Sequence, residues 1–295
     1  MDLMLRARLE ALERDAGLWD ESALQARAEA GDWLRFVQGS LATRGDAAAA
    51  AMLPRMAELV ARIEKTDEAL FARFYMALKS GQLHGSCLCT YLEHFTEYRM
   101  GKHQRCLTHD GLDLLLNGAL HREAIPQGMQ SLGAEMVHFE QTPARLFLEL
   151  IDRVPLGASD RFYDLGSGLG RIPILIHLLT GVEAVGIEIQ SEYCAYARRC
   201  AVALGLDRVR FVNADVQSAD LSRGTVFFMF TPFVGAVLQR VLTRLRHLAM
   251  STPITIGTYG PITPIVARQP WLHNVADTDD PYRLGIFVSR MSPRP

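Results

Sequence analysis

A short acidic and glycine-rich segment is the part of this sequence best suited to bind a ligand. It reads Asp164-Leu-Gly-Ser-Gly-Leu-Gly170 and is followed at once by an apolar run from Ile172 to Leu179. Because glycine lacks a Cβ, a loop with Gly166, Gly168 and Gly170 can turn tightly and bring its backbone close to a ligand. A helix that begins behind such a loop offers free N–H groups. The segment therefore predicts a strand, a nucleotide-binding loop and a helix.

The acidic residue of this segment indicates which nucleotide would bind. The glycine spacing is Gly-x-Gly-x-Gly, one residue shorter than in dinucleotide-binding folds, and Asp164 stands just before the first glycine. A carboxylate there would repel a pyrophosphate but would attract a cation. S-adenosylmethionine carries an ammonium and a sulfonium. Asp164 therefore favours S-adenosylmethionine over NAD as the cofactor, and Ser167 of the same loop is a further candidate to contact it.

Two further acidic residues end apolar segments that read as the next strands of a βαβ series. Glu188 lies about 20 residues beyond the glycine loop, where a doubly wound fold places the carboxylate that accepts hydrogen bonds from ribose hydroxyls. Asp215 ends the following apolar segment and could accept a bond from the adenine amino group. Their neighbours Ile189 and Val216 are apolar and are candidates to contact the cofactor, Val216 by packing on the adenine ring.

These motifs resemble those of class I S-adenosylmethionine-dependent methyltransferases, and among them the Dot1-type branch. The resemblance covers about residues 136 to 262 and includes Phe139-Glu140-Gln141-Thr142-Pro143 upstream of the glycine loop. In that family a segment at this position folds over the methionine part of the cofactor. The resemblance thus implies Gln141 and Thr142 as cofactor contacts, and it places the ribose at Glu188 and the adenine at Asp215.

The segment expected to face the methyl acceptor departs from this family. After the fourth strand the chain reads Phe230-Thr231-Pro232-Phe233, where Dot1-type enzymes have an asparagine-rich segment. The candidates to line the acceptor site are Phe230, Thr231 and Tyr259 at strand ends, with His138 as a candidate base. Aromatic walls can hold an amine by cation–π attraction. The alternatives are that Phe230 and Phe233 are core residues and that His138 is a helix cap or surface residue.

A second cluster of residues has the chemistry to bind zinc. The histidines and cysteines in question are His84, Cys87, Cys89, His94, His103, Cys106 and His109. Their spacing fits no familiar zinc module, and free cysteine on a helix often behaves as a small buried hydrophobe. We therefore expect no metal, although the sequence leaves metal binding open. Cys194 and Cys200 are expected to be packing residues.

Composition limits the remaining possibilities. The chain has 295 residues, 49% of them hydrophobic and 22% charged, with a net charge of −2, which is an ordinary globular balance with no electrostatic signature of nucleic-acid binding. It has no apolar run long enough to cross a membrane and no segment typical of a signal peptide. We therefore expect a cytoplasmic protein that acts on a small-molecule or protein methyl acceptor, without nucleic-acid or membrane partners. The sequence does not indicate the oligomeric state.

The pattern of apolar residues changes near residue 130. Up to residue 130 it predicts an all-helical N-terminal domain, with helices over 3–15, 21–30, 33–41, 47–63, 68–80, 88–100 and 112–120. From 131 to 295 strands and helices alternate, which predicts an α/β, doubly wound Rossmann-like methyltransferase domain with a parallel sheet. Its strands are predicted at 161–164, 184–187, 209–213, 226–230, 254–259 and 284–289. Its helices include 144–153 and 193–204.

The sequence thus supports a methyltransferase that acts on nitrogen or oxygen of a small molecule or a protein side chain. Two alternatives remain. A nicotinamide-dependent oxidoreductase is disfavoured by Asp164 and by the glycine spacing. A non-catalytic S-adenosylmethionine-binding protein is suggested by Phe230-Thr231-Pro232-Phe233, which lacks the usual catalytic amide or carboxylate.

Overall fold

The computed structural model describes residues 2–43, 47–96, 98–99, 101, 110–129 and 133–290. The chain forms two compact units. The helical unit consists of Met1–Ala77, Thr90–Tyr98 and Asp110–Arg122, and the sheet unit consists of Leu78–Cys89, Arg99–His109 and Glu123–Pro295. The predicted domain boundary at residue 130 stays a prediction.

Two helices of the first part of the chain, α2 and α3, are longer than the sequence predicts, and α4 ends at Phe95, earlier than the predicted 100. Their bounds are α1 Asp2–Arg14, α2 Leu24–Ala42, α3 Ala47–Lys79, α4 Gly85–Phe95 and α5 Gly111–Leu120, with a 3₁₀ turn at Ala16–Trp19. The breaks predicted at Gly31 and between residues 63 and 68 are wrong, because α2 and α3 continue through them. A helical glycine costs about 1 kcal/mol, and in α2 the buried Leu34 and Val37 outweigh that cost by packing against α1 and α3.

A buried arginine organises the helical unit. Arg27 of α2 is 0% exposed, and its Nε donates to Asp67 Oδ1 of α3 at 2.5 Å. Its remaining donors bind the backbone carbonyls of Leu18 and Glu21, both at 3.1 Å, and of Asp20. Burial raises the pKa of Asp67, although Arg27 opposes that rise. Arg27 thus ties the turn between α1 and α2 to α3.

Replacing Arg27 by methionine should destabilise the helical unit by about 3 to 5 kcal/mol, the usual cost of breaking a buried ion pair from one side. The side chain would no longer satisfy the Asp67 carboxylate or the three carbonyls. Thermal denaturation followed by circular dichroism would measure the loss. A variant as stable as the wild type would contradict this account, and Arg27→Lys, which keeps the charge, should lie between the two.

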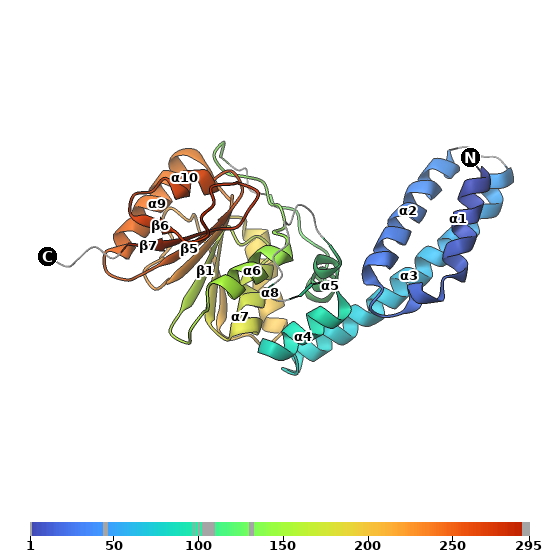
Figure 1. Cartoon of the computed structure of the whole chain (residues 1–295), viewed down its shortest axis with the longest axis horizontal. Helices are drawn as coiled ribbons and strands as arrows, with labels where there is room; N and C mark the ends of the chain where they lie inside the picture. Colours follow the sequence, from blue (N-terminus) through green and yellow to red (C-terminus); the bar gives the residue numbers. More distant parts are fainter. Residues whose placement is uncertain are drawn as a thin grey trace. The chain divides into compact units, whose positions relative to one another are not determined.

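The sheet unit is a seven-stranded sheet with helices on both faces (Figure 1). The strand order is β3-β2-β1-β4-β5-β7-β6. The strands are β1 Arg161–Leu165, β2 Glu183–Glu188, β3 Val209–Asn213, β4 Val226–Phe230, β5 Thr255–Tyr259, β6 Leu272–Asn274 and β7 Gly285–Ser289. The helices are α6 Ala144–Arg153, α7 Arg171–Thr180, α8 Ser191–Ala203, α9 Gly235–Ala249 and α10 Thr263–Ala267. In Figure 1, α7 and α8 lie on one face of the sheet and α9 and α10 on the other. The doubly wound α/β fold predicted from the sequence is confirmed.

The central strands are buried on both faces, which explains their continuous apolar sequences. β3 lies at the edge of the sheet, and its burial alternates at the start of the strand, as expected for an edge position. Residues on the α9 side of the central strands, including Tyr163, Ile187 and Met229, pack against Leu238 and Val241 of α9. This packing fixes the carboxyl ends of β1, β2 and β4 at one edge of the sheet.

The prediction of a wholly parallel sheet is wrong for the last strand. β7 pairs antiparallel with both β5 and β6. The chain returns from β6 to β7 through residues 275–284 without a helix, and such a connection suits antiparallel strands, since a parallel pair needs a crossover. β6 was missed in the sequence because its three residues, Leu272 to Asn274, are too few to show a period.

Candidate functional site

A cavity of about 610 Å³ lies at the carboxyl ends of β1, β2, β4 and β5. Doubly wound folds bind ligands at this edge, where the strand order reverses. Most of the residues predicted to form the site line the cavity: His138, Gln141, Thr142, Asp164, Gly166, Ser167, Glu188, Ile189, Val216, Phe230, Thr231 and Tyr259. Gly168, Gly170 and Asp215 are not among its lining residues, so the structure gathers most, but not all, of the predicted site around one space.

The three glycines of the loop adopt positive φ angles, 92° at Gly166, 50° at Gly168 and 83° at Gly170. Other residues rarely adopt this conformation. A Cβ at Gly166 would lie 2.3 Å from Pro232 Cβ, one at Gly168 would lie 2.3 Å from Phe139 Cε2, and one at Gly170 would lie 2.6 Å from the Ala197 Cβ. Neighbouring protein groups therefore require glycine at all three positions. Their predicted contacts with a cofactor stay predictions.

Gly168→Val should abolish cofactor binding. A side chain at residue 168 would clash with the Phe139 ring, which lies over the loop, and would strain a backbone at φ 50°. We expect the helical unit to stay folded, as far-ultraviolet circular dichroism would show. Isothermal titration with S-adenosylhomocysteine measures the binding, and a variant that bound like the wild type would contradict the packing of Phe139 on this glycine.

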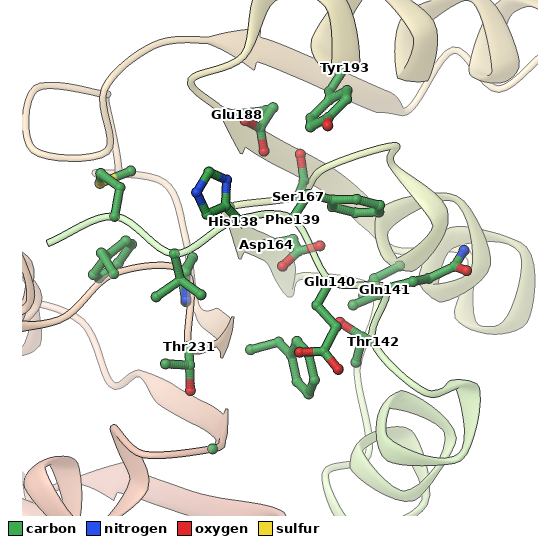
Figure 2. A pocket seen from close by; sticks show the side chains of 18 of the residues that line it. His138, Phe139, Glu140, Gln141, Thr142, Asp164, Ser167, Glu188, Tyr193 and Thr231 are labelled. Atoms are coloured by element: carbon green, nitrogen blue, oxygen red, sulfur yellow. The ribbon is translucent and has the colours of Figure 1, made fainter. Parts of the chain in front are cut away.

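Asp164 is a buried carboxylate that faces the cavity. Its exposed fraction is 2%, and within the described residues no hydrogen bond satisfies its oxygens. Burial, together with the nearby negative charge of Glu188, raises the pKa of Asp164 to about 8. Figure 2 shows its carboxylate directed between the glycine loop and the segment that carries His138. A buried acid without a partner is costly to ionise, so the site suits a cationic group that pairs with it.

The hydroxyl of Ser167 is the second polar group that lacks a partner. Its Oγ is buried and makes no hydrogen bond among the residues described. The backbone N–H groups of Gly166 and Ser167 both donate to the Ile187 carbonyl, at 2.9 and 3.0 Å, which holds the loop against β2. Asp164 and Ser167 together leave an unsatisfied acceptor and hydroxyl inside the cavity, which fits the amino acid end of S-adenosylmethionine.

Glu188 at the end of β2 holds the glycine loop in place. Its Oε2 accepts from Gly168 N and its Oε1 from Gln190 N, both at 2.8 Å. Burial raises the pKa of Glu188, while these backbone N–H groups partly offset the rise. A carboxylate has about four acceptor positions. Glu188 therefore supports the loop through both carboxylate oxygens, and its contact with the ribose stays a prediction.

The third acidic strand end, Asp215, is not among the residues that line the cavity. Asp215 caps its own turn, because its Oδ1 accepts from Gln217 N at 2.8 Å and its Oδ2 from Gln217 Nε2 at 3.0 Å. The adjacent Val216 is 5% exposed and lines the cavity together with Ala214. The contact of Asp215 with an adenine amino group stays a prediction. Val216 and Ile189 supply an apolar part of the cavity wall.

The segment from residue 133 to residue 143, here called the flap, crosses the strand ends. Met136 pairs with Phe233 in an isolated antiparallel bridge, and Val137 N donates to the Pro232 carbonyl at 3.1 Å. The flap therefore lies against the segment that follows β4. Figure 2 shows His138, Phe139 and Glu140 along it, with the Phe139 ring beside Tyr193, whose ring centroid is 5.3 Å away.

Glu135 anchors the start of the flap on the first turn of α9. Its Oε1 accepts from Ala236 N and its Oε2 from Val237 N, both at 3.0 Å. These N–H groups hold the pKa of Glu135 below its usual value, and the charge of Arg240 lowers it further. A carboxylate at a helix N-terminus is stabilised by the unsatisfied N–H groups there. The flap is thus attached to α9 as well as to the β4 end.

The side of the cavity at the ends of β4 and β5, where the sequence predicts the methyl acceptor, is aromatic. Phe230 and Tyr259 stack with ring centroids 5.4 Å apart. Thr231 has a φ of 41°, a strained value for a β-branched residue, and its Oγ1 donates to the Tyr259 carbonyl at 2.7 Å. Gly260 makes this contact feasible, because a Cβ at that position would lie 2.2 Å from Thr231 Oγ1. Thr231 therefore joins the ends of β4 and β5 instead of presenting a free hydroxyl.

Sequence reasoning missed several residues of the cavity wall. Arg171 begins α7, is buried, and donates through Nη2 to the Thr142 carbonyl, which fixes the end of the flap. Gln190 and Tyr193 line the cavity from the residues that follow Glu188. Their position just after an acidic strand end was the signal that could have identified them. Arg171 gave no such signal, since its role depends on a contact with a distant segment.

The cysteine and histidine cluster is partly outside the described residues. His103, Cys106 and His109 fall there, while Cys87 is exposed and Cys89 is half-buried. Within the described residues no group of three or more histidine, cysteine or acidic side chains could hold a metal ion. Cys194 is buried in α8, and burial raises the pKa of its thiol.

Among the residues that the structure describes, no helix is long and apolar enough to span a membrane.

One family model matches the chain. It is described as histone methylation protein DOT1 and covers residues 132–229, about a third of the chain, which includes the flap, the glycine loop and the three acidic strand ends. No curated protein sequence matches the chain significantly.

Several solved methyltransferase structures are similar to part of the chain. An RNA methyltransferase from Salinibacter ruber in complex with S-adenosylhomocysteine is 24% identical with a TM-score of 0.41, over 53% of this chain and 97% of that one. A human methyltransferase 10 domain containing protein is 14% identical with a TM-score of 0.40, over 52% and 85%. A putative S-adenosylmethionine-dependent methyltransferase from Methanococcus maripaludis is 13% identical with a TM-score of 0.39, over 50% and 85%.

The family match and the cavity agree on the cofactor. The matched residues are those that place an unpartnered acid, a glycine loop and a second carboxylate around one space. The oxidoreductase alternative would place a pyrophosphate beside Asp164, which is electrostatically unfavourable. Over residues 132–229 the chain is therefore similar to the DOT1 methylation proteins, which agrees with S-adenosylmethionine as the cofactor.

Proposed function

We propose that this enzyme transfers the methyl group of S-adenosylmethionine to nitrogen or oxygen of a small molecule or a protein side chain, with an amine nitrogen favoured. The observation that carries the proposal is the buried Asp164 carboxylate, which faces the cavity and has no hydrogen-bond partner among the described residues. We assign the catalytic domain to residues 131–295, as the sequence predicts.

The cofactor would lie along the edge of the sheet, with its amino acid end at the glycine loop. Asp164 would pair with the ammonium and Ser167 would donate to the carboxylate, while Gln141 and Thr142 of the flap cover the methionine part. Glu188 would accept hydrogen bonds from the ribose hydroxyls. Ile189, Asp215 and Val216 would surround the adenine. This order follows the succession of β1, β2 and β3 in the sheet.

S-adenosylmethionine supplies an electrophilic methyl group on a sulfonium, so the protein mainly has to orient a nucleophile and exclude water. The stacked rings of Phe230 and Tyr259 form a wall that can hold an amine by cation–π attraction. Glu140 adds a carboxylate at the cavity, which also favours a cationic acceptor. His138 is the candidate to accept the proton that an ammonium must lose before it attacks.

Thr231 has a different role in this proposal. Its hydroxyl donates to the Tyr259 carbonyl and is therefore engaged. We assign it to holding the ends of β4 and β5 so that the two aromatic rings stay stacked. The lack of an asparagine or aspartate in this segment means that the amine is oriented by the aromatic wall and by Glu140.

An acceptor screen with methyl-labelled S-adenosylmethionine tests this proposal. The panel contains small primary amines, lysine-bearing peptides, phenols and carboxylic acids, with wild type, Glu140→Gln, Phe230→Leu and the exposed His247→Gln as a matched surface control. Transfer to an amine that Glu140→Gln and Phe230→Leu reduce about tenfold or more, and that His247→Gln leaves unchanged, supports the proposal. Transfer only to phenols or acids would contradict the preference for an amine.

A further inference from the structure

The loop after β3, residues 214–219, forms the wall where the proposed function places the adenine. Ala214 and Val216 line the cavity from this loop. Its own turn is closed by Ser218 N and Ala219 N, which donate to the Asp215 carbonyl at 3.0 and 2.9 Å. The groups that hold this loop therefore also hold the adenine wall, given the proposed placement of the adenine.

Arg244 of α9 binds the backbone of the loop at two points. Its Nη1 donates to the Val216 carbonyl at 2.6 Å, and its Nη2 donates to the Ala219 carbonyl. An arginine can hold two acceptors at once because its guanidinium is planar and its donors form a fixed fork. The side chain is half-buried. Arg244 therefore fixes the position of the loop relative to α9.

Arg240, one turn earlier on α9, acts on the side chains of the same loop. Its Nε donates to Gln217 Oε1. With its oxygen engaged, the Gln217 amide presents its nitrogen to Asp215 Oδ2, at 3.0 Å. The Gln217 backbone N–H binds the other carboxylate oxygen of Asp215 at 2.8 Å. Arg240 thus sets the orientation of the Asp215 carboxylate through Gln217.

We propose that Arg244 and Arg240 are positioning residues for adenine recognition. Arg244 holds the backbone of residues 216 and 219 so that Val216 faces the ring, and Arg240 orients Asp215 to accept a hydrogen bond from the 6-amino group. Neither arginine lines the cavity. The same helix carries the Glu135 anchor of the flap, so α9 supports the cofactor site from two directions.

Competition titrations with two ligands test this role. One ligand is S-adenosylhomocysteine, and the other is S-inosylhomocysteine, in which an oxygen replaces the 6-amino group. The wild type should prefer the adenosyl compound by about tenfold or more. In the inosyl compound the 6-oxygen would face the Asp215 carboxylate, so a hydrogen bond is lost and two acceptors repel each other. Arg240→Gln and Arg244→Gln should weaken the adenosyl compound by about tenfold and the inosyl compound by less, so that the preference falls toward one.

Matched variants separate positioning from a general loss of structure. Arg246→Gln changes an exposed arginine of the same helix and should leave both affinities unchanged. Arg244→Lys can reach one carbonyl and should keep part of the preference. Equal weakening of both ligands, or an unchanged preference in both glutamine variants, would overturn the inference while leaving the proposed function intact. A wild type that binds neither ligand would instead refute the proposed function.

Discussion

Replacing Asp164 by asparagine should reduce the affinity for S-adenosylmethionine by at least about a hundredfold, which corresponds to roughly 3 kcal/mol. The amide keeps the size of the side chain but cannot neutralise an ammonium. The same variant should make the ligand-free protein more stable at about pH 8, because it removes a buried acid that must ionise without a partner. Few substitutions combine a large loss of binding with a gain in stability.

The direction of the pH dependence follows from the raised pKa of about 8 at Asp164. Between the ordinary aspartate pKa and this value the folded protein binds one more proton than the unfolded chain, so the free energy of unfolding contributed by Asp164 falls as the pH rises. Cofactor affinity changes in the opposite direction and should rise toward about pH 8, since binding a cation requires the ionised carboxylate.

Thermal denaturation and calorimetric titration at about pH 6 and pH 8 would check both parts. The wild type should lose stability and gain affinity between these two values, and Asp164→Asn should show neither of these contributions. Asp207→Asn, in the exposed turn between α8 and β3, is the matched control and should behave like the wild type. An asparagine variant that was no more stable at the higher pH would contradict the burial of an unpartnered carboxylate.

Glu188→Ala should weaken cofactor binding by about 1.5 to 3 kcal/mol, the value expected for lost hydrogen bonds to a charged acceptor. The structure adds a second effect, because Gly168 N and Gln190 N would each lose a hydrogen bond of 2.8 Å. The glycine loop should therefore become less ordered, and hydrogen exchange at these two amides should accelerate.

Titration with S-adenosylhomocysteine measures the affinity, and hydrogen exchange measures the loop. Glu188→Gln is informative because its amide would place a donor near one of these N–H groups, so it should recover only part of the binding. Glu58→Ala, at an exposed position of α3, serves as the control. Normal affinity in Glu188→Ala would refute the assignment of the ribose to this residue.

The parts of the site that carry a local signal in the sequence could be predicted. The glycine loop and Glu188 both sit at ends of buried strands, where the apolar run and the residue that follows it are local signals. Their convergence around one cavity follows from the parallel order of β1 and β2. The family resemblance identified the flap, which sequence periodicity alone would not have shown.

Features that depend on contacts between distant segments could not be predicted. The Phe139 ring that explains Gly168, and the bond from Arg171 to the Thr142 carbonyl, become visible only when the flap is placed over the loop. The continuity of α2 through Gly31 likewise depends on packing that outweighs local propensity. The short β6 was missed because three residues carry no period.

The measurement that tests the account most directly is calorimetric titration of the full chain with S-adenosylmethionine, S-adenosylhomocysteine and NAD at about pH 8, with Asp164→Asn in parallel. We expect the two sulfur compounds to bind with dissociation constants on the order of micromolar, corresponding to roughly 8 kcal/mol, and NAD not to bind. The variant should lose most of the affinity for both sulfur compounds. Binding of NAD alone, or binding of S-adenosylmethionine that Asp164→Asn leaves unchanged, would contradict the account.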